Sequence, residues 1–270
     1  MTDIRNPGAA PRADSHPGTA ATPALPMARA RAFQTRAQSL AAAGGVVAPI
    51  VALLGLFGSG VMPPDAADQT AQQIAEVYTT HGHIRIAGLL VGFLAIGLLG
   101  PLVTVISGQL RRIETAPHFG STLQLVAGTV TWVLLSIPLL ILVVAAYRTD
   151  RNPEITQALQ DLGWILFLLP VAPFLVQNAV IALVILSDTD RRPIYPRWVA
   201  YANVFIGASF LPDLLLGYFF TGPLAYHGVF CFWIPTVTYG LWLVMMGVTT
   251  WQAVTRQGRE PAPAASEAVA

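Results

Sequence analysis

The chain has 270 residues, of which 54% are hydrophobic and only 11% are charged. A soluble domain usually carries about 25% charged residues because its surface faces water, so this composition excludes a soluble globular protein. All 15 basic residues are arginine, and 14 acidic residues balance them to a net charge of +1, which provides no basic surface for nucleic acid. The single cysteine, Cys231, excludes an intramolecular disulfide framework and a zinc site built on several thiolates.

The N-terminal segment, residues 1–38, is rich in Ala, Pro, Arg and Thr and has no apolar period, so we predict a disordered cytoplasmic tail there. It is too long and too polar to be the n-region of a cleaved signal peptide, which makes the first apolar stretch a retained anchor. A membrane domain is predicted over 39–252, and a second disordered tail over 253–270.

Six apolar stretches follow the N-terminal tail, each long enough to cross a bilayer as a helix, which takes about 20 residues. They cover 42–62, 84–107, 121–147, 162–186, 199–220 and 230–251. Open sheets cannot satisfy their backbone polar groups in lipid. The sequence therefore predicts an all-α, polytopic membrane protein, a six-transmembrane-helix bundle in contact with the lipid bilayer.

The arginines predict the orientation of this bundle. Five lie in the N-terminal tail, two in the second-to-third connection, three in the fourth-to-fifth connection and two in the C-terminal tail, twelve in all. Only Arg85, Arg148 and Arg151 lie on the other side. By the positive-inside rule, both termini are expected to be cytoplasmic, in the cell membrane. Trp198 and Trp251 end their helices on the same side, where amphipathic rings favour the headgroup layer.

The first outer connection predicts one extracytoplasmic surface helix of about four turns. Asp65 is placed as an N-cap after two prolines, and Gly82 as the residue that ends the helix. Apolar residues recur between them at helical spacing, at Ala67, Ala71, Ile74 and Tyr78. In the next outer connection, Asn152 is an N-cap followed by Pro153, so the fourth span is expected to begin outside the membrane.

Asp213 is the one acidic residue well inside a predicted span, roughly 10 Å below its outer boundary. A carboxylate at this depth is costly unless it is protonated, paired or hydrated, so it is a functional candidate. The alternative is a structural aspartate next to Pro212, whose missing N–H leaves a carbonyl free one turn earlier. Arg85 is the expected counter-ion of Asp213 or of Glu76.

Three histidines fall on the predicted outer side: His81, His83 and His227. With Glu76 or Asp213 they would supply enough nitrogen and oxygen ligands for zinc or another divalent metal. Histidines at a membrane interface also serve as ordinary hydrogen-bonding or pH-sensitive groups. We assign no metal and no cofactor, and keep a metal site on these histidines as an alternative.

Several residues inside the spans are interpreted chiefly as packing devices. Gln177 and Asn178 are expected to link helices by hydrogen bonds, or to line a cavity. Gly88 and Gly92 form a small-xxx-small pair that suits an internal helix contact or a homo-oligomer. Prolines bend membrane helices and make room for a cavity; they occur at Pro49, Pro101, Pro138, Pro170, Pro173, Pro212 and Pro235.

A set of short motifs carries a resemblance to a known group. The chain has Pro-Arg-Trp at 196–198, Leu-Pro-Asp at 211–213, Gly-Pro-Leu-Ala-Tyr-His-Gly at 222–228 and Phe-Trp-Ile-Pro at 232–235. With Pro63-Pro64 and the segment 81–85, this pattern resembles a group of multi-pass membrane proteins common in actinobacteria. That group has no established activity, so the resemblance implies the fold and no reaction.

The sequence favours an outer-half vestibule around Asp213 that binds a small apolar or amphipathic ligand, in transport or in an accessory role. Its expected binding residues are Asp213, Arg85, His81, His227, Tyr226 and Trp233. A metal-dependent membrane enzyme using His81, His83 and His227 is the first alternative, although HExxH, P-loop, GxSxG and Rossmann motifs are all missing from the sequence. A structural subunit of a membrane complex, with a partner protein or a second copy, is the other.

Overall fold

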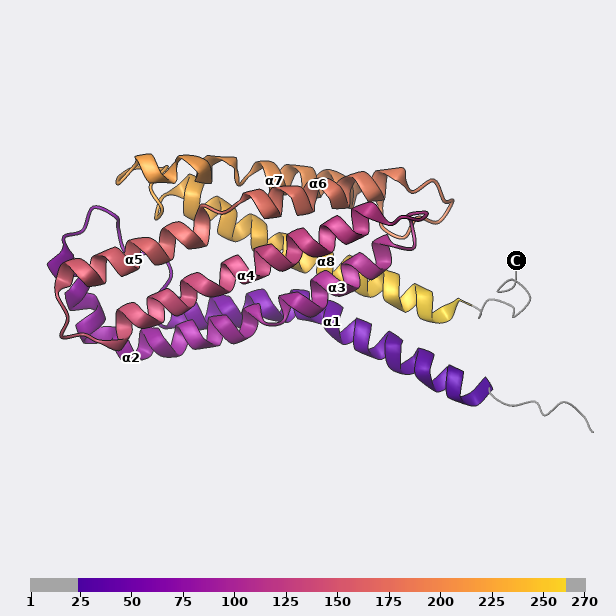
Figure 1. Ribbon diagram of the computed structural model, residues 1–270, viewed down its shortest axis with the longest axis horizontal. Coiled ribbons are helices and arrows are strands. Elements are labelled where there is room, and N and C mark those ends of the chain that lie inside the picture. The colour runs from indigo at the N-terminus through magenta and orange to yellow at the C-terminus, as the bar shows by residue number, and fades with distance from the viewer. Residues whose placement is uncertain (1–23, 261–270) are drawn as a thin grey trace, which may run out of the picture.

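The computed structural model describes residues 24–260, and this part of the chain is helical without a strand. Figure 1 shows the helices side by side in one elongated bundle. The α-helices are α1 (Ala24–Gly58), α2 (Ala71–Ile96), α3 (Leu99–Leu110), α4 (Phe119–Tyr147), α5 (Pro153–Leu168), α6 (Ala172–Ser187), α7 (Arg197–Ala208) and α8 (Ile234–Arg259). A 3₁₀ helix, η1 (Leu211–Tyr218), and a π-helical turn, η2 (Val229–Trp233), precede α8.

These elements form six helices long and apolar enough to cross a membrane, which confirms the predicted six-helix bundle. They are Arg29–Gly58, Ala71–Leu110, Phe119–Tyr147, Pro153–Ser187, Arg197–Tyr218 and Val229–Arg259. The start of α1 and the end of α8 lie at the same end of the bundle (Figure 1), as an even number of spans requires. The cytoplasmic location of that end remains a prediction from its arginines.

Large apolar side chains cover the outside of the bundle. Leu54, Leu94 and Phe205 are 72%, 72% and 71% exposed. Apolar surface of this extent is unfavourable in water and is typical of helices surrounded by lipid. The surface therefore agrees with an integral membrane protein.

Helix α1 begins earlier than the sequence predicted. It starts at Ala24, so residues 24–38, expected to belong to a disordered tail, continue the first span as a helix. Helix α8 likewise runs to Arg259, into the segment expected to be the second tail. Ala, Arg and Gln dominate both extensions, and they are good helix formers despite their low hydropathy. The remaining parts of the predicted tails, 1–23 and 261–270, lie outside the described residues.

The surface helix predicted between Asp65 and Gly82 does not form as a separate element, because its residues from Ala71 on are the first turns of α2, which continues into the second span. Helix α2 begins after Thr70, whose side chain accepts from the Gln73 backbone N–H while the Gln73 side chain accepts from the Thr70 N–H, a complete capping box. Gly82 is buried inside α2, and a Cβ there would lie 3.4 Å from the Ala146 carbonyl oxygen of α4. That distance is an ordinary van der Waals contact, so Gly82 lies in the packing of α2 against α4 and does not end the helix, which continues into the second span.

The structure also bears on the predicted Asn152 N-cap and on the Gly88/Gly92 pair. The Asn152 side chain accepts a hydrogen bond from the Glu154 N–H at 3.0 Å, so α5 begins at the predicted N-cap. The glycine pair of α2 makes an internal contact with α1, because a Cβ on Gly88 would overlap Ser59 and one on Gly92 would press on Leu56. These glycines are thus used inside the bundle.

Candidate functional site

Four of the six spans contain a break in the α-helix or a change of helix type. The second span is interrupted between α2 and α3, and the fourth span is interrupted between α5 and α6 at Pro170. The fifth changes from α7 to the 3₁₀ helix η1, which contains Pro212, and the sixth begins with the π turn before Pro235 of α8. Irregular backbone at membrane depth is tolerated where it is buried in protein or lines a cavity.

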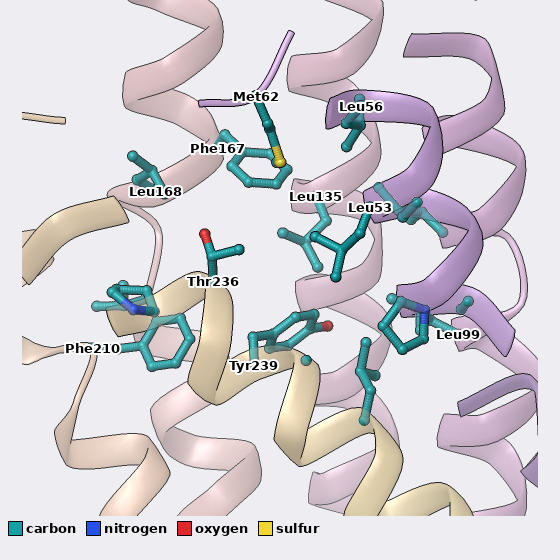
Figure 2. Close-up of a pocket in the computed structure, with 18 of the residues that line it drawn as sticks. Leu53, Leu56, Met62, Leu99, Leu135, Phe167, Leu168, Phe210, Thr236 and Tyr239 are labelled. Carbon is teal, nitrogen blue, oxygen red and sulfur yellow. The ribbon is translucent and has the colours of Figure 1, made fainter. Parts of the chain in front are cut away.

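The residues beside these four interruptions surround a single cavity of about 130 Å³. Figure 2 shows Leu53, Phe167 and Tyr239, from α1, α5 and α8, pointing into it. Its lining is apolar except for Asp213, Thr236 and Tyr239. The remaining lining residues are Ala48, Pro49, Ala52, Leu56, Met62, Ile96, Leu99, Leu135, Leu168, Pro170, Val171, Phe210, Pro235, Gly240 and Leu243.

One wall of the cavity is held by aromatic packing. The rings of Phe210 and Tyr239 lie edge-on to Phe174, with centroid separations of 4.8 and 5.1 Å. Tyr239 also stacks on Trp242 at 5.8 Å. Edge-to-face and stacked pairs fix ring orientation beyond what apolar burial alone does. The cavity wall is therefore preformed.

Asp213 is fully buried, and neither oxygen of its carboxyl has a hydrogen-bond partner among the described residues. The Cys231 thiol lies beside the carboxyl, but its hydrogen-bond geometry is directed at the carbonyl oxygens of Leu224 and Pro212, at 3.2 and 3.5 Å. A buried polar group without a partner costs about 1–3 kcal/mol. This carboxyl is therefore a destabilising group in a residue that lines an apolar cavity.

Arg85 is not the counter-ion of Asp213 or of Glu76, as the sequence suggested. Its guanidinium donates two hydrogen bonds to Asp65, at 2.7 and 3.0 Å, and lies 5.1 Å from the centroid of the Tyr78 ring. The Arg85 side chain is only 7% exposed, and that of Asp65 is only 16% exposed. The reason is the path of the loop 59–70, which folds back onto α2 and brings Asp65 to Arg85.

His227, Tyr226 and Trp233 lie just before α8, at the end of the bundle away from the start of α1. The His227 imidazole accepts a hydrogen bond from the Ala67 N–H through Nδ1 at 3.1 Å, so it binds the same loop 59–70. The Tyr226 hydroxyl donates to Asp161 at 3.2 Å, and burial, with the adjacent Asp161 charge, raises the pKa of Tyr226 above its ordinary value. Trp233 packs on Phe57 and stays 40% exposed.

The predicted histidine cluster does not form. His81 and His83 are exposed on α2, whereas His227 is half-buried against the loop 59–70. Within 24–260, no group of three or more His, Cys, Asp or Glu side chains is arranged to hold a metal ion. The geometry therefore offers no support for the metal-dependent alternative.

Of the six binding residues expected from the sequence, Asp213 alone lines the cavity. Arg85 and His227 instead form hydrogen bonds with the loop 59–70, which contains the lining residue Met62. The aromatic lining residues Phe167 and Tyr239 were missed because nothing distinguishes them from ordinary apolar residues of a span. The prolines of the spans could have indicated the position of the cavity, because prolines bend helices and make room for a cavity. Three of the seven line it: Pro49, Pro170 and Pro235.

The adjacent amides Gln177 and Asn178 lie away from the cavity. Asn178 donates to the Phe174 carbonyl oxygen at 2.8 Å, within its own helix. The Gln177 amide nitrogen would be 2.6 Å from a Cβ placed on Gly128, so it lies in the contact between α4 and α6. The Gln177 amide nitrogen and the Asn178 amide oxygen have no hydrogen-bond partner among the described residues, so the expected hydrogen-bonded link between helices does not form, and neither residue lines the cavity.

Searches with protein-family models, against curated proteins and against solved structures found no match to this chain. Neither a family nor an activity is therefore assigned by similarity. Function has to be argued from the cavity and from the unpartnered carboxyl on its wall.

Proposed function

We propose that this integral membrane protein binds a small, mostly apolar molecule in the cavity, and that Asp213 accepts a hydrogen bond from the single polar group of that molecule. The observation that carries the proposal is that Asp213, one of the residues lining an otherwise largely apolar cavity, has a fully buried carboxyl with both oxygens unpartnered. Apolar pockets with a few polar groups that fix orientation are typical ligand sites. Binding of this kind serves transport or an accessory step in the membrane.

The cavity limits the size of the bound group. Its volume is about 130 Å³, and an apolar cavity of about 150 Å³ holds one benzene molecule. A six-membered ring or a short branched alkyl group therefore fits the enclosed space. A longer lipid chain would have to extend beyond it.

The proposed route into the cavity is lateral, from the hydrocarbon. Leu53 of α1 belongs to the lining and is also 37% exposed on the outside of the bundle. Thr236 and Gly240 of α8, the helix packed against α1, line the cavity and are half-buried. On the outer side, Met62 covers the cavity from a loop that Asp65 and His227 hold in place.

Gly240 provides a direct test, because it lines the cavity and a Cβ there would meet no atom within 4 Å. Gly240→Leu should fill the cavity without distorting the fold. Gly108→Leu is the matched control, since Gly108 is helical, equally free of neighbours and away from the cavity. The probes are 4-fluorophenol, a ring with one hydrogen-bond donor, and fluorobenzene, the same ring without it, observed by ¹⁹F NMR in nanodiscs.

The wild-type protein and Gly108→Leu should broaden the 4-fluorophenol signal saturably, and Gly240→Leu should not. A hydrogen bond to Asp213 is worth about 0.5–1.5 kcal/mol, so 4-fluorophenol should bind about 2- to 10-fold more tightly than fluorobenzene. Asp213→Val should remove that preference. Saturable binding that Gly240→Leu leaves unchanged would disprove the assignment of this cavity.

Asp213→Val also separates a binding role from a structural one. If the carboxyl is kept for a ligand, replacing it by an apolar group of similar size should stabilise the protein without ligand by about 1–3 kcal/mol, because an unpartnered buried polar group is removed. A loss of stability in Asp213→Val would show that the carboxyl supports the fold.

A further inference from the structure

A second pocket, unrelated to the Asp213 cavity, lies at the end of the bundle where α8 ends. It has a volume of about 590 Å³ and lies between the segment 192–196, the last turns of α8 and the residue Arg112 that follows α3. Four guanidinium groups and one carboxylate line it: Arg112, Arg192, Arg256, Arg259 and Glu260. The pocket is therefore strongly cationic, in a chain whose net charge is only +1.

Two of the four arginines are fixed in position by the protein. Arg112 donates to the Gln109 side chain and to both carboxylate oxygens of Glu260, each at 2.9 Å, and Gln109 in turn donates to Gln257. Arg256 donates to the backbone carbonyl oxygens of Pro193 and Ile194. These contacts hold the last turns of α8 against the two neighbouring connections.

The segment 192–196 is itself held rigidly. The Asp188 carboxylate accepts the backbone N–H groups of Asp190 and Ile194, both at 3.0 Å. The buried Tyr195 hydroxyl pairs with Thr250 of α8 at 3.0 Å. Asp188 is only 6% exposed and does not line the pocket, so Glu260 is the one carboxylate among the lining residues.

Arg192 and Arg259 complete the pocket with exposed side chains that make no hydrogen bond to another described residue. Guanidinium groups bind phosphate oxygens bidentately, which makes clustered arginines a typical phosphate site. Trp198 and Trp251, 54% and 49% exposed, lie on α7 and α8 close in sequence to the lining residues Pro196 and Ala253. Exposed tryptophans of this kind mark the headgroup level of a bilayer.

We propose that this arginine pocket binds a phosphate group, that of an anionic lipid headgroup or of a soluble phosphate compound. Basic pockets between membrane helices bind phosphate-bearing headgroups in just this setting. The protein supplies two arginines already oriented by Gln109, Glu260 and the carbonyls of 193–194, and two that are free to close on the ligand. The Asp213 cavity has no part in this binding.

The test uses the purified full chain in a neutral detergent, because a ligand that binds the folded protein raises its thermal midpoint saturably. Four titrations are compared: phosphatidylglycerol, phosphatidylcholine, sodium phosphate, and sodium chloride at matched ionic strength. The variant is Arg192→Gln/Arg259→Gln, which breaks no hydrogen bond between described residues. The matched control is Arg148→Gln/Arg151→Gln, which removes two arginines from the other end of the bundle.

Phosphatidylglycerol or sodium phosphate should stabilise the wild-type protein and the control saturably, whereas phosphatidylcholine and sodium chloride should not. Loss of two guanidiniums should weaken binding in the Arg192→Gln/Arg259→Gln variant by about thirtyfold. A response to phosphatidylglycerol alone identifies a lipid as the source of the phosphate, and an equal response to sodium phosphate identifies a soluble compound. Equal losses in the variant and the control, or no saturable response to either phosphate, would overturn the proposal.

Discussion

The ion pair between Asp65 and Arg85 should be among the most important polar contacts for stability in this protein. Asp65→Asn removes the negative charge and leaves the Arg85 guanidinium, 7% exposed, without a counter-ion. Breaking a buried pair by removing one partner costs about 3–5 kcal/mol. Because the Asp65 side chain is still 16% exposed, water screens part of the remaining charge, and we expect a loss near the lower limit, about 3 kcal/mol.

The assay is unfolding of the purified protein in mixed micelles titrated with sodium dodecyl sulfate, followed by circular dichroism. Glu260→Gln is the control, because it breaks the ion pair between Glu260 and Arg112. In that pair the Arg112 side chain is 26% exposed and the Glu260 side chain is 54% exposed. An exposed pair of that kind contributes less than about 1 kcal/mol. A double-mutant cycle of Asp65→Asn with Arg85→Gln measures the coupling directly.

A loss in Asp65→Asn no larger than that in Glu260→Gln would refute this reasoning. So would additive effects of Asp65→Asn and Arg85→Gln, since two residues that form a buried pair must be coupled. A large loss with strong coupling would establish that the fold of the loop 59–70 depends on this pair, and with it the position of Met62 over the cavity.

Three further predictions can be checked with the same unfolding assay. Gly247→Ala should lower the free energy of unfolding by about 1–3 kcal/mol, because the added Cβ would lie 2.9 Å from the Ala42 carbonyl oxygen at the crossing of α1 and α8. Gly108→Ala, with open space around it, should cost nothing. Equal effects of the two substitutions would contradict the close crossing. Asn203→Leu should lower the free energy of unfolding by about 0.6–1.7 kcal/mol. The reason is that Asn203 accepts a hydrogen bond from the Trp242 indole at 2.9 Å and donates one to the Val199 carbonyl oxygen at 2.8 Å. A stabilised variant would show that these hydrogen bonds contribute nothing. Burial alone would raise the pKa of Glu114, but hydrogen bonds from Ser121 and Gly120 hold it below its ordinary value of 4.5. Glu114 therefore contributes stability above pH 4.5 that is lost as the pH falls through the lowered pKa. The stability difference between the wild-type protein and Glu114→Gln should disappear over that range, and a difference that persists at low pH would contradict the assignment.

The number of spans and the Asn152 helix start could be predicted from the sequence, whereas the equally local Thr70–Gln73 capping box was missed in favour of Asp65. Apolar length along one segment decides whether that segment crosses a bilayer, and six such stretches gave the six helices that the structure has. The Asn152 cap depends only on its own neighbours, so it was predicted correctly. Asp213 was recognised as unusual for the same kind of reason, because its cost follows from its depth in one helix.

The tertiary structure decided everything that depends on which segments meet. Gly82 looked like a helix end, but it lies buried inside α2 and faces the Ala146 carbonyl of α4. The sequence offered Asp213 or Glu76 as the partner of Arg85, whereas the path of one loop brings Asp65 to it. The cavity exists because interruptions in four separate spans lie around one point, and no single helix contains that information. Hydropathy and capping are local properties of the chain, whereas ion pairing and cavity formation depend on distances between segments far apart in sequence.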